Sequence, residues 1–228
     1  MELSPKELEN LNNYIKMLIN YPINLTSYKD EKKAFENLIL DSLIPVMKDE
    51  RFLNSQNVVD VGTGGGIPGI VWAICFPNKK FYLVDSTRKK IQAVRLFIKK
   101  LNLKNVEVFD ERVEVFAKKY KEFFDYATCK ALSRSDIALE YLSPLVKIGG
   151  TIALFKGPSY FSEEIIYVER VEKILKVKKE YEIEYEVGNG EIKKRYLVIF
   201  KKVGKIPQKF PREIGFAKKY PLGESTND

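Results

Sequence analysis

The sequence predicts an α/β fold, in which a doubly wound, mostly parallel sheet is closed by an antiparallel hairpin and preceded by a helical cap. Three observations favour it. Short strand-like runs alternate with helical patterns through the middle of the 228-residue chain. A glycine-rich loop follows the first of these runs, between Asp60 and Gly69. Near the end, two runs alternate at period two around Gly188-Asn189-Gly190, which indicates a hairpin.

Residues 1–54 predict a helical cap packed on the core. Ser4-Pro5-Lys6-Glu7 has the form of a capping box with proline at the first helical position. Apolar residues then recur at helical spacing as far as Tyr21-Pro22. A second helical pattern extends from Asp30 to Ile44 and ends before Pro45.

Residues 55–202 form the predicted core and residues 203–228 a basic tail, within one structural domain. The helical pattern between strands is clearest at Arg88–Leu101. The predicted strands are runs rich in β-branched or aromatic residues: Asn57–Val61, Lys80–Asp85, Val106–Asp110, Phe124–Cys129, Thr151–Phe155, Glu180–Val187 and Ile192–Lys201.

The loop from Asp60 to Gly69 carries the strongest functional signal. Its glycines allow positive φ and let a ligand lie against bare backbone, and the helix beyond offers unpaired N–H groups. The next strand ends in Asp85, where a carboxylate can accept both hydroxyls of a ribose. The loop also satisfies the G-x-G-x-x-G pattern of dinucleotide-binding proteins. Asp60 favours S-adenosylmethionine instead, because a carboxylate attracts an ammonium and a sulfonium but repels a pyrophosphate.

The composition excludes several kinds of catalytic and metal-binding site. The absence of histidine removes the commonest general base and metal ligand, and every Ser-His or Cys-His arrangement. Cys75 and Cys129 lie in apolar runs, so we expect a reducing cytosol and no disulfide framework. No apolar run reaches the roughly 18 residues of a membrane span, and the polar start argues against a secretory signal.

The formal net charge is +8, and much of the excess lies near the end of the chain. Aromatic residues and prolines are interleaved with basic ones there, which is typical of an extended strip that follows phosphates or stacks on bases. A solvated lysine-rich terminus is the alternative. The residues predicted to contact RNA are Lys201, Lys202, Lys205, Lys209, Arg212, Lys218 and Lys219.

Ligands in open α/β sheets bind beyond the carboxyl ends of the strands, so residues there are the site candidates. Several of these segments, with parts of the cap and tail, resemble the bacterial ribosomal RNA small subunit methyltransferase G family, also called glucose-inhibited division protein B. The resemblance extends in order over nearly the whole chain. It rests on Asn24-Leu25-Thr26-Ser27, Leu40-Asp41-Ser42-Leu43, Asp60-Val61-Gly62-Thr63-Gly64, Gly66-Ile67-Pro68-Gly69-Ile70, Asp85-Ser86, Arg112-Val113-Glu114, Lys156-Gly157 and the segment 207–222.

The resemblance implies the seven-stranded class I S-adenosylmethionine-dependent methyltransferase fold. The implied reaction is methylation of N7 of a guanine in the 530 loop of 16S ribosomal RNA (guanine 527 in the usual rRNA numbering), with S-adenosylhomocysteine as the other product. The implied partner is the small ribosomal subunit in the cytoplasm. We expect a monomer, with no metal and no membrane partner.

The resemblance also implies residue roles. Gly62 and Ile67 would contact the cofactor, Asp85 its ribose, and Val113-Glu114 its adenine edge. Lys130, where the family usually has an arginine, would orient cofactor and target, although it lacks the planar fork of arginine. Leu38 stands where the family usually has a histidine. The full predicted cofactor set is Asp60, Gly62, Gly64, Gly66, Ile67, Asp85, Ser86, Arg112, Val113, Glu114 and Lys130.

Guanine N7 carries an in-plane lone pair and no proton, so its methylation needs alignment and desolvation rather than a base. The sequence lacks the Pro-Cys step of cytosine C5 methylases and the Asn/Asp-Pro-Pro-aromatic turn of exocyclic amine methylases. Lys130 stands where a ribose 2′-O enzyme would want an acid. Three alternatives stay open: another RNA, small-molecule or protein methyltransferase; an inactive RNA-binding assembly factor that retains the fold; and a nicotinamide oxidoreductase.

Overall fold

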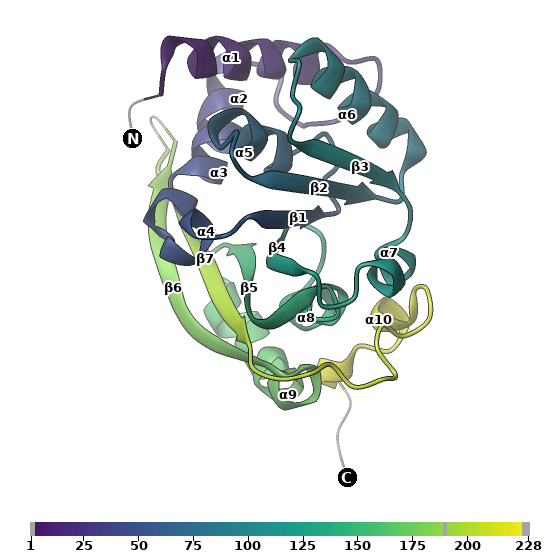
Figure 1. Ribbon diagram of the computed structural model, residues 1–228. Coiled ribbons are helices and arrows are strands. Elements are labelled where there is room, and N and C mark those ends of the chain that lie inside the picture. The colour runs from purple at the N-terminus through teal and green to yellow at the C-terminus, as the bar shows by residue number, and fades with distance from the viewer. Residues whose placement is uncertain (1–2, 189–190, 225–228) are drawn as a thin grey trace.

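A computed structural model describes residues 3–188 and 191–224 and confirms the α/β fold (Figure 1). A 7-stranded sheet has the order β3-β2-β1-β4-β5-β7-β6. The first five strands are parallel, whereas β7 pairs antiparallel with both β5 and β6. The strands are β1 (Asn57–Val61), β2 (Lys80–Asp85), β3 (Val106–Asp110), β4 (Phe124–Lys130), β5 (Val146–Lys156), β6 (Val177–Val187) and β7 (Lys193–Lys202).

The topology places the candidate site residues at one edge of the sheet. From β1 the chain adds β2 and β3 on one side, and then crosses back to add β4 on the other. The register pairs Val61 with Val84, Asp85 with Asp110, and Lys130 with Phe155, so these strand ends are level. The reversal between β1 and β4 is the switch point at which open α/β sheets bind ligands.

Helices cover both faces of the sheet, and neighbouring residues of β1 alternate between them. Val58 belongs to the apolar core that includes α1, α5 and α6, whereas Val59 and Val61 belong to the core that includes α7, α8 and α9. Burial on both sides explains why these strands read as continuous apolar runs. The helices that follow the strands are α5 (Gly69–Cys75), α6 (Arg88–Lys100), α7 (Val113–Lys119), α8 (Ser135–Leu142) and α9 (Ile165–Leu175).

The N-terminal helices pack against the glycine loop and α5. Helix α1 (Pro5–Ile19) begins with the predicted capping box. Tyr14 Oη donates a hydrogen bond to Gly65 O at 2.9 Å, and Trp72 Nε1 donates to Ser42 O at 2.8 Å. The predicted second helix is interrupted by π-helical turns, and α4 was not predicted. These elements are α2 (Glu31–Ala34), a π-helical stretch (Phe35–Leu40), α3 (Asp41–Leu43), a 3-10 turn (Val46–Lys48) and α4 (Glu50–Leu53).

The segment after β7 folds back along the molecule toward α7 and α8 (Figure 1). Ile206, Phe210 and Ala217 are at most 2% exposed and anchor it. It contains α10 (Phe216–Lys219) and a 3-10 turn (Leu222–Glu224) that packs on α9. Because these apolar residues recur at intervals, the segment 203–224 is packed on the core and is not an extended strip. We call this segment the strap. The predicted β6–β7 turn lies partly outside the described residues, at Asn189-Gly190.

Candidate active site

The loop between β1 and α5 adopts a conformation that requires glycine. Gly62, Gly64 and Gly66 have φ of +73°, +59° and +104°, in the left-handed region. Gly62 N and Thr63 N both donate to Val84 O, at 2.7 and 3.1 Å, which joins the loop to the end of β2. These two hydrogen bonds fix the loop at the switch point, where its backbone forms the base, or floor, of the site.

Asp85 completes this floor. Its Oδ2 accepts a hydrogen bond from Gly64 N at 2.9 Å, and its Oδ1 accepts from Thr87 N at 2.8 Å. Each carboxylate oxygen has a further lone pair, so both can still accept from a ligand hydroxyl. The carboxylate is therefore oriented by backbone before any ligand arrives.

A cavity of about 250 Å³ lies beyond the ends of β1, β2 and β4. Among its lining residues that were not predicted to bind cofactor, Leu132, Tyr141 and Lys218 come from outside the β1, β2 and β3 strand ends. Leu132 lies over the glycine loop, since a Cβ built on Gly62 would be 2.6 Å from Leu132 Cδ1. No motif marks Leu132 or Tyr141, whereas Lys218 was singled out as an RNA contact. The predicted cofactor residues that line the cavity are Gly62, Asp85, Ser86, Arg112, Val113 and Glu114.

Glu114 connects this cavity to the C-terminal strap. Its side chain is buried, and Oε1 accepts a hydrogen bond from Gly215 N at 2.9 Å. Lys218, one helical turn further along the strap, lines the same cavity. The strap therefore contributes to the wall of the site, a contact between residues far apart in the sequence.

Asp60 lies beneath the loop instead of lining the cavity. Its Oδ2 accepts from Thr63 Oγ1 at 2.7 Å and from Gly69 N at 3.0 Å, whereas its buried Oδ1 has no partner among the described residues. Burial raises the pKa of Asp60 to about 7, although these two hydrogen bonds act in the opposite direction. Gly64, Gly66, Ile67 and Lys130 also do not line the cavity.

Lys130 is bound to the N-terminal helices. Its Nζ lies 2.7 Å from Asp41 Oδ2, and both side chains are mostly buried. Tyr185 Oη, from β6, donates to Asp41 Oδ1 at 2.9 Å. Because an ammonium is a point charge, lysine can pair with one carboxylate without the fork of arginine. The role of Lys130 in orienting substrate stays a prediction.

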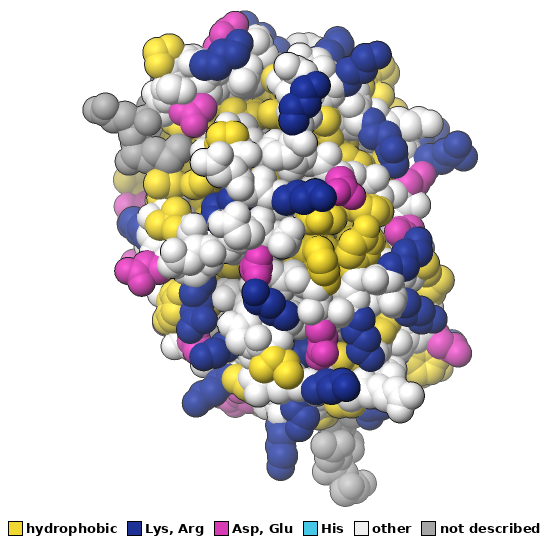
Figure 2. Space-filling view, in the orientation of Figure 1, with side chains coloured by type: hydrophobic (Ala, Val, Ile, Leu, Met, Phe, Trp, Pro, Cys, Tyr) yellow, Lys and Arg dark blue, Asp and Glu magenta, His cyan; other side chains and the backbone are white. Residues whose placement is uncertain are grey.

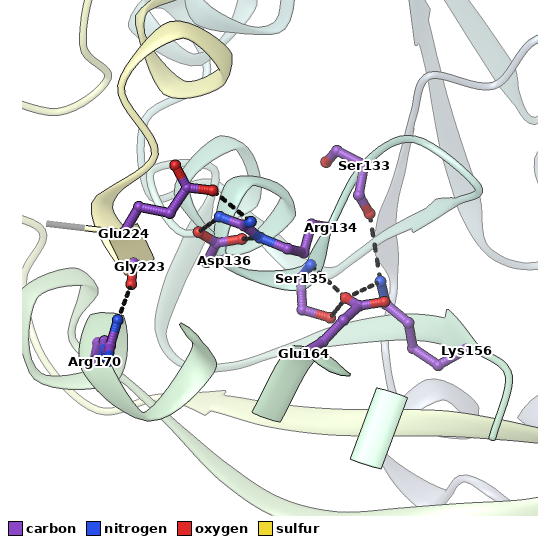
Figure 3. Close-up of polar contacts among 9 residues, drawn as sticks. All are labelled: Ser133, Arg134, Ser135, Asp136, Lys156, Glu164, Arg170, Gly223 and Glu224. Atoms are coloured by element: carbon purple, nitrogen blue, oxygen red, sulfur yellow. Dashed lines mark hydrogen bonds and ion pairs between the residues drawn. The ribbon is translucent and has the colours of Figure 1, made fainter. Parts of the chain in front are cut away.

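A second cavity, of about 620 Å³, lies beyond the ends of β4 and β5 and shares Ala131 and Leu132 with the first. Arg134, on its rim, is held by Asp136 at 2.8 and 2.9 Å and by Glu224 at 2.6 Å. Figure 3 shows these contacts joining the loop before α8 to the end of the strap. The strap therefore braces both cavities.

The structure divides the residues predicted to contact RNA. Lys202 is fully buried, and its Nζ donates to Ser143 O at 2.9 Å, so the prediction for Lys202 is wrong: it cannot reach a phosphate from this position. Arg212 forms an ion pair with Glu140, which makes it a structural contact of the strap. Lys201 is half-buried on β7. Lys205, Lys209, Lys218 and Lys219 are exposed.

Basic and acidic side chains are mixed on the surface of the molecule. Figure 2 shows Lys and Arg side chains spread over the visible face, with Asp and Glu side chains between them.

Among residues 3–188 and 191–224, no cluster of three or more His, Cys, Asp or Glu side chains is placed to hold a metal. Over the same residues, no helix is long and apolar enough to cross a membrane.

Known proteins are similar in sequence to this chain over nearly its whole length. A family model described as rRNA small subunit methyltransferase G matches residues 7–196. The ribosomal RNA small subunit methyltransferase G of Petrotoga mobilis is 59% identical over 224 residues, which cover 98% of this chain and 99% of that protein. Its counterpart from Thermotoga maritima is 38% identical over 216 residues, covering 95% and 88% respectively.

Solved structures share the fold at lower identity. A SAM dependent methyltransferase from Aquifex aeolicus matches with a TM-score of 0.54 and 21% identity, over 84% of this chain and 98% of that one. A 16S rRNA (adenine(1408)-N(1))-methyltransferase from Catenulisporales acidiphilia matches with a TM-score of 0.53 and 15% identity, over 66% and 89%. These two similarities show the architecture of a class I methyltransferase.

Proposed function

The chain belongs to the ribosomal RNA small subunit methyltransferase G family, and from this premise we propose that it transfers a methyl group from S-adenosylmethionine to N7 of a guanine in the 530 loop of 16S ribosomal RNA. The observation that carries the cofactor assignment is the Asp85 carboxylate, held beside the glycine loop by Gly64 N at 2.9 Å. The small ribosomal subunit is the proposed partner, and the cytoplasm the proposed location.

The residues at the switch point fit this cofactor. Asp85 would accept the ribose hydroxyls, and Arg112, Val113 and Glu114 would enclose the adenine, since all four line the cavity of about 250 Å³. When ionised, the Asp60 carboxyl supplies negative charge beneath the loop, which suits the ammonium of a methionine group. The same charge opposes a pyrophosphate, so a nicotinamide dinucleotide fits less well.

S-adenosylmethionine, when bound, supplies a methyl group on a sulfonium, and guanine N7 supplies an unprotonated lone pair. The protein therefore has to align the two and exclude water, and no side chain has to remove a proton. Leu132 and Ala131 lie between the two cavities and would exclude water from the reacting atoms. Burial raises the pKa of the Cys129 thiol to about 12, which argues against a cysteine nucleophile after β4.

Nucleoside mass spectrometry of ribosomal RNA treated with the protein and labelled cofactor tests this function. We expect N7-methylguanosine, whose cationic ring makes the strand cleavable by borohydride and aniline. RNA in which the target guanine is replaced by 7-deazaguanine should remain unmethylated. A product methylated on a ribose oxygen or an exocyclic amine would refute the proposed function.

A further inference from the structure

The cavity beyond β4 and β5 holds a pair of charged side chains to which neither a motif nor the proposed cofactor assigns a role. Lys156 Nζ and Glu164 Oε2 are 2.7 Å apart, and the side chains are 10% and 19% exposed. Both line this cavity, which adjoins the proposed cofactor cavity through Ala131 and Leu132. A group bound here would therefore lie next to the proposed methyl donor.

The two oxygens of Glu164 have different surroundings. Oε2 accepts three hydrogen bonds, from Ser135 N at 2.6 Å, Ser135 Oγ at 2.6 Å and Lys156 Nζ at 2.7 Å. Oε1 has no hydrogen-bond partner among the described residues, and it is accessible from the cavity side rather than enclosed. Figure 3 shows the carboxylate between Ser135 and Lys156. Glu164 therefore offers one fixed, unused acceptor.

Lys156 offers a matching donor. An ammonium has three N–H groups, and here two of them reach Glu164 Oε2 and Ser133 O, the latter at 3.3 Å. The third is available to a ligand. Burial alone would raise the pKa of Glu164, but the hydrogen bonds from Lys156 and Ser135 outweigh it and hold this pKa below its ordinary value. Glu164 thus stays ionised, and its free acceptor lies beside the Lys156 donor.

We propose that Lys156 and Glu164 form the guanine-reading pair of this enzyme, with Glu164 Oε1 accepting from guanine N1–H and Lys156 Nζ donating to guanine O6. Guanine presents N1–H and O6 side by side, and its N7 lies on the edge beyond O6. Adenine presents the opposite order, an acceptor at N1 and a donor at N6. Its acceptor would therefore face the acceptor Glu164 Oε1, and its donor would face the donor Lys156 Nζ. This inference rests on the proposed function and names the residues that select its target base.

Contacts from α8 and the strap hold the Lys156–Glu164 pair in position. Glu164 bonds Ser135, the first residue of α8, and Arg134 beside it is held by Asp136 and by Glu224 of the strap. The Arg134 guanidinium also stacks on Tyr167, 3.9 Å from the ring centre. A reading pair needs such fixed geometry, because discrimination between bases depends on hydrogen bonds that cannot rearrange.

Glu164→Gln tests the proposal. Its amide oxygen can keep the bonds from Ser135 and Lys156, which turns the free position from an acceptor into an N–H donor. The substrates are small-subunit RNAs, naked and assembled with subunit proteins, that carry guanine, hypoxanthine or 2-aminopurine at the target position. All three bases keep N7. Hypoxanthine retains N1–H and O6, whereas 2-aminopurine has an acceptor at N1 and no O6.

For the wild-type enzyme we expect kcat/KM with hypoxanthine within about tenfold of guanine, and a strong preference over 2-aminopurine. Glu164→Gln should lower the guanine to 2-aminopurine ratio of kcat/KM by between about tenfold and 100-fold. Its affinity for S-adenosylhomocysteine should stay unchanged. Glu169→Gln, the same chemical change on an exposed residue of α9, should keep the wild-type ratio.

A purely structural role for Glu164 would lower methylation of all three bases equally, and this result would overturn the proposal. A similar fall in the guanine to 2-aminopurine ratio in Glu163→Gln, whose side chain lines the same cavity, would also overturn it. If Glu164→Gln does not fold, Lys156→Met decides, because it should reduce guanine methylation more than 2-aminopurine methylation. Failure of the wild type to methylate guanine RNA, or methylation of 7-deazaguanine RNA, would instead refute the proposed function.

Discussion

Asp60→Asn should change how the stability of the protein depends on pH. Burial raises the pKa of Asp60 to about 7 in the folded protein, whereas an aspartate in an unfolded chain has a pKa of about 3.9. The folded state therefore holds this proton more tightly than the unfolded state does. The resulting stabilisation is fully present below about pH 4 and is lost as the pH rises through about 7.

The expected magnitude follows from these two pKa values. Between pH 5 and pH 7.5 they give a loss of roughly 2–3 kcal/mol in the free energy of unfolding of the wild type. Asparagine cannot titrate, so the difference in unfolding free energy between wild type and Asp60→Asn should fall by that amount. The chain has no histidine, so few other side chains titrate in this window.

Urea unfolding followed by circular dichroism at fixed pH values measures this difference. Any constant cost of the asparagine amide cancels, because the test is the change with pH. Glu163→Gln, the same kind of substitution on an exposed side chain, serves as the control. A difference between wild type and Asp60→Asn that stays constant from pH 5 to 7.5 would refute the reasoning.

Asp85→Ala should weaken S-adenosylhomocysteine binding by about 1–3 kcal/mol, because it removes a charge-assisted acceptor; unchanged affinity by calorimetry would remove Asp85 from the site. A ligand ammonium bound above the glycine loop should lower the pKa of Asp60 and release protons on binding at pH 6.5, which calorimetry in two buffers of different ionisation enthalpy detects. Neutralising the exposed Lys205, Lys209 and Lys219 should reduce the salt dependence of RNA binding by about 0.7–0.9 in log–log slope per lost phosphate contact. Lys202→Met, at a buried position, should leave that slope unchanged, and equal slopes for all variants would exclude the strap from RNA binding. Lys130→Arg should retain single-turnover activity and Lys130→Ala should lose it, whereas normal activity of the alanine variant would assign Lys130 to packing alone.

Sequence patterns predicted the parallel part of the sheet closely. The bounds of β1, β2 and β3 agree with the predicted ranges, because short buried strands read as compact apolar runs between turn residues. Strand β5 begins at Val146, well before the predicted start at Thr151, since its first part contains glycines. The second N-terminal helix was predicted as continuous, but π-helical turns interrupt it. Spacing along the sequence does not record such a change of pitch.

The glycine loop and Asp85 could be found from the sequence because their chemistry is local. Positive φ at Gly62, Gly64 and Gly66 is a property of three nearby residues, and the acid at the end of a strand is a property of one. The basic segment was also visible in the sequence, but its path was not. Buried anchors at Ile206, Phe210 and Ala217 fold it onto the core, and this separates the buried Lys202 from the exposed lysines.

The sequence by itself determined the fold class, the glycine-rich loop, the family and a chemistry without histidine. Only the tertiary structure placed Glu164 beside Lys156, Glu114 against Gly215, and Lys130 against Asp41. The last two pairs join residues far apart in the chain, and in all three the side chains meet because of helix docking and sheet register. A single sequence specifies each residue's local preference, whereas the partner of a buried charge is decided by packing, which selects the arrangement that leaves fewest charges unpaired.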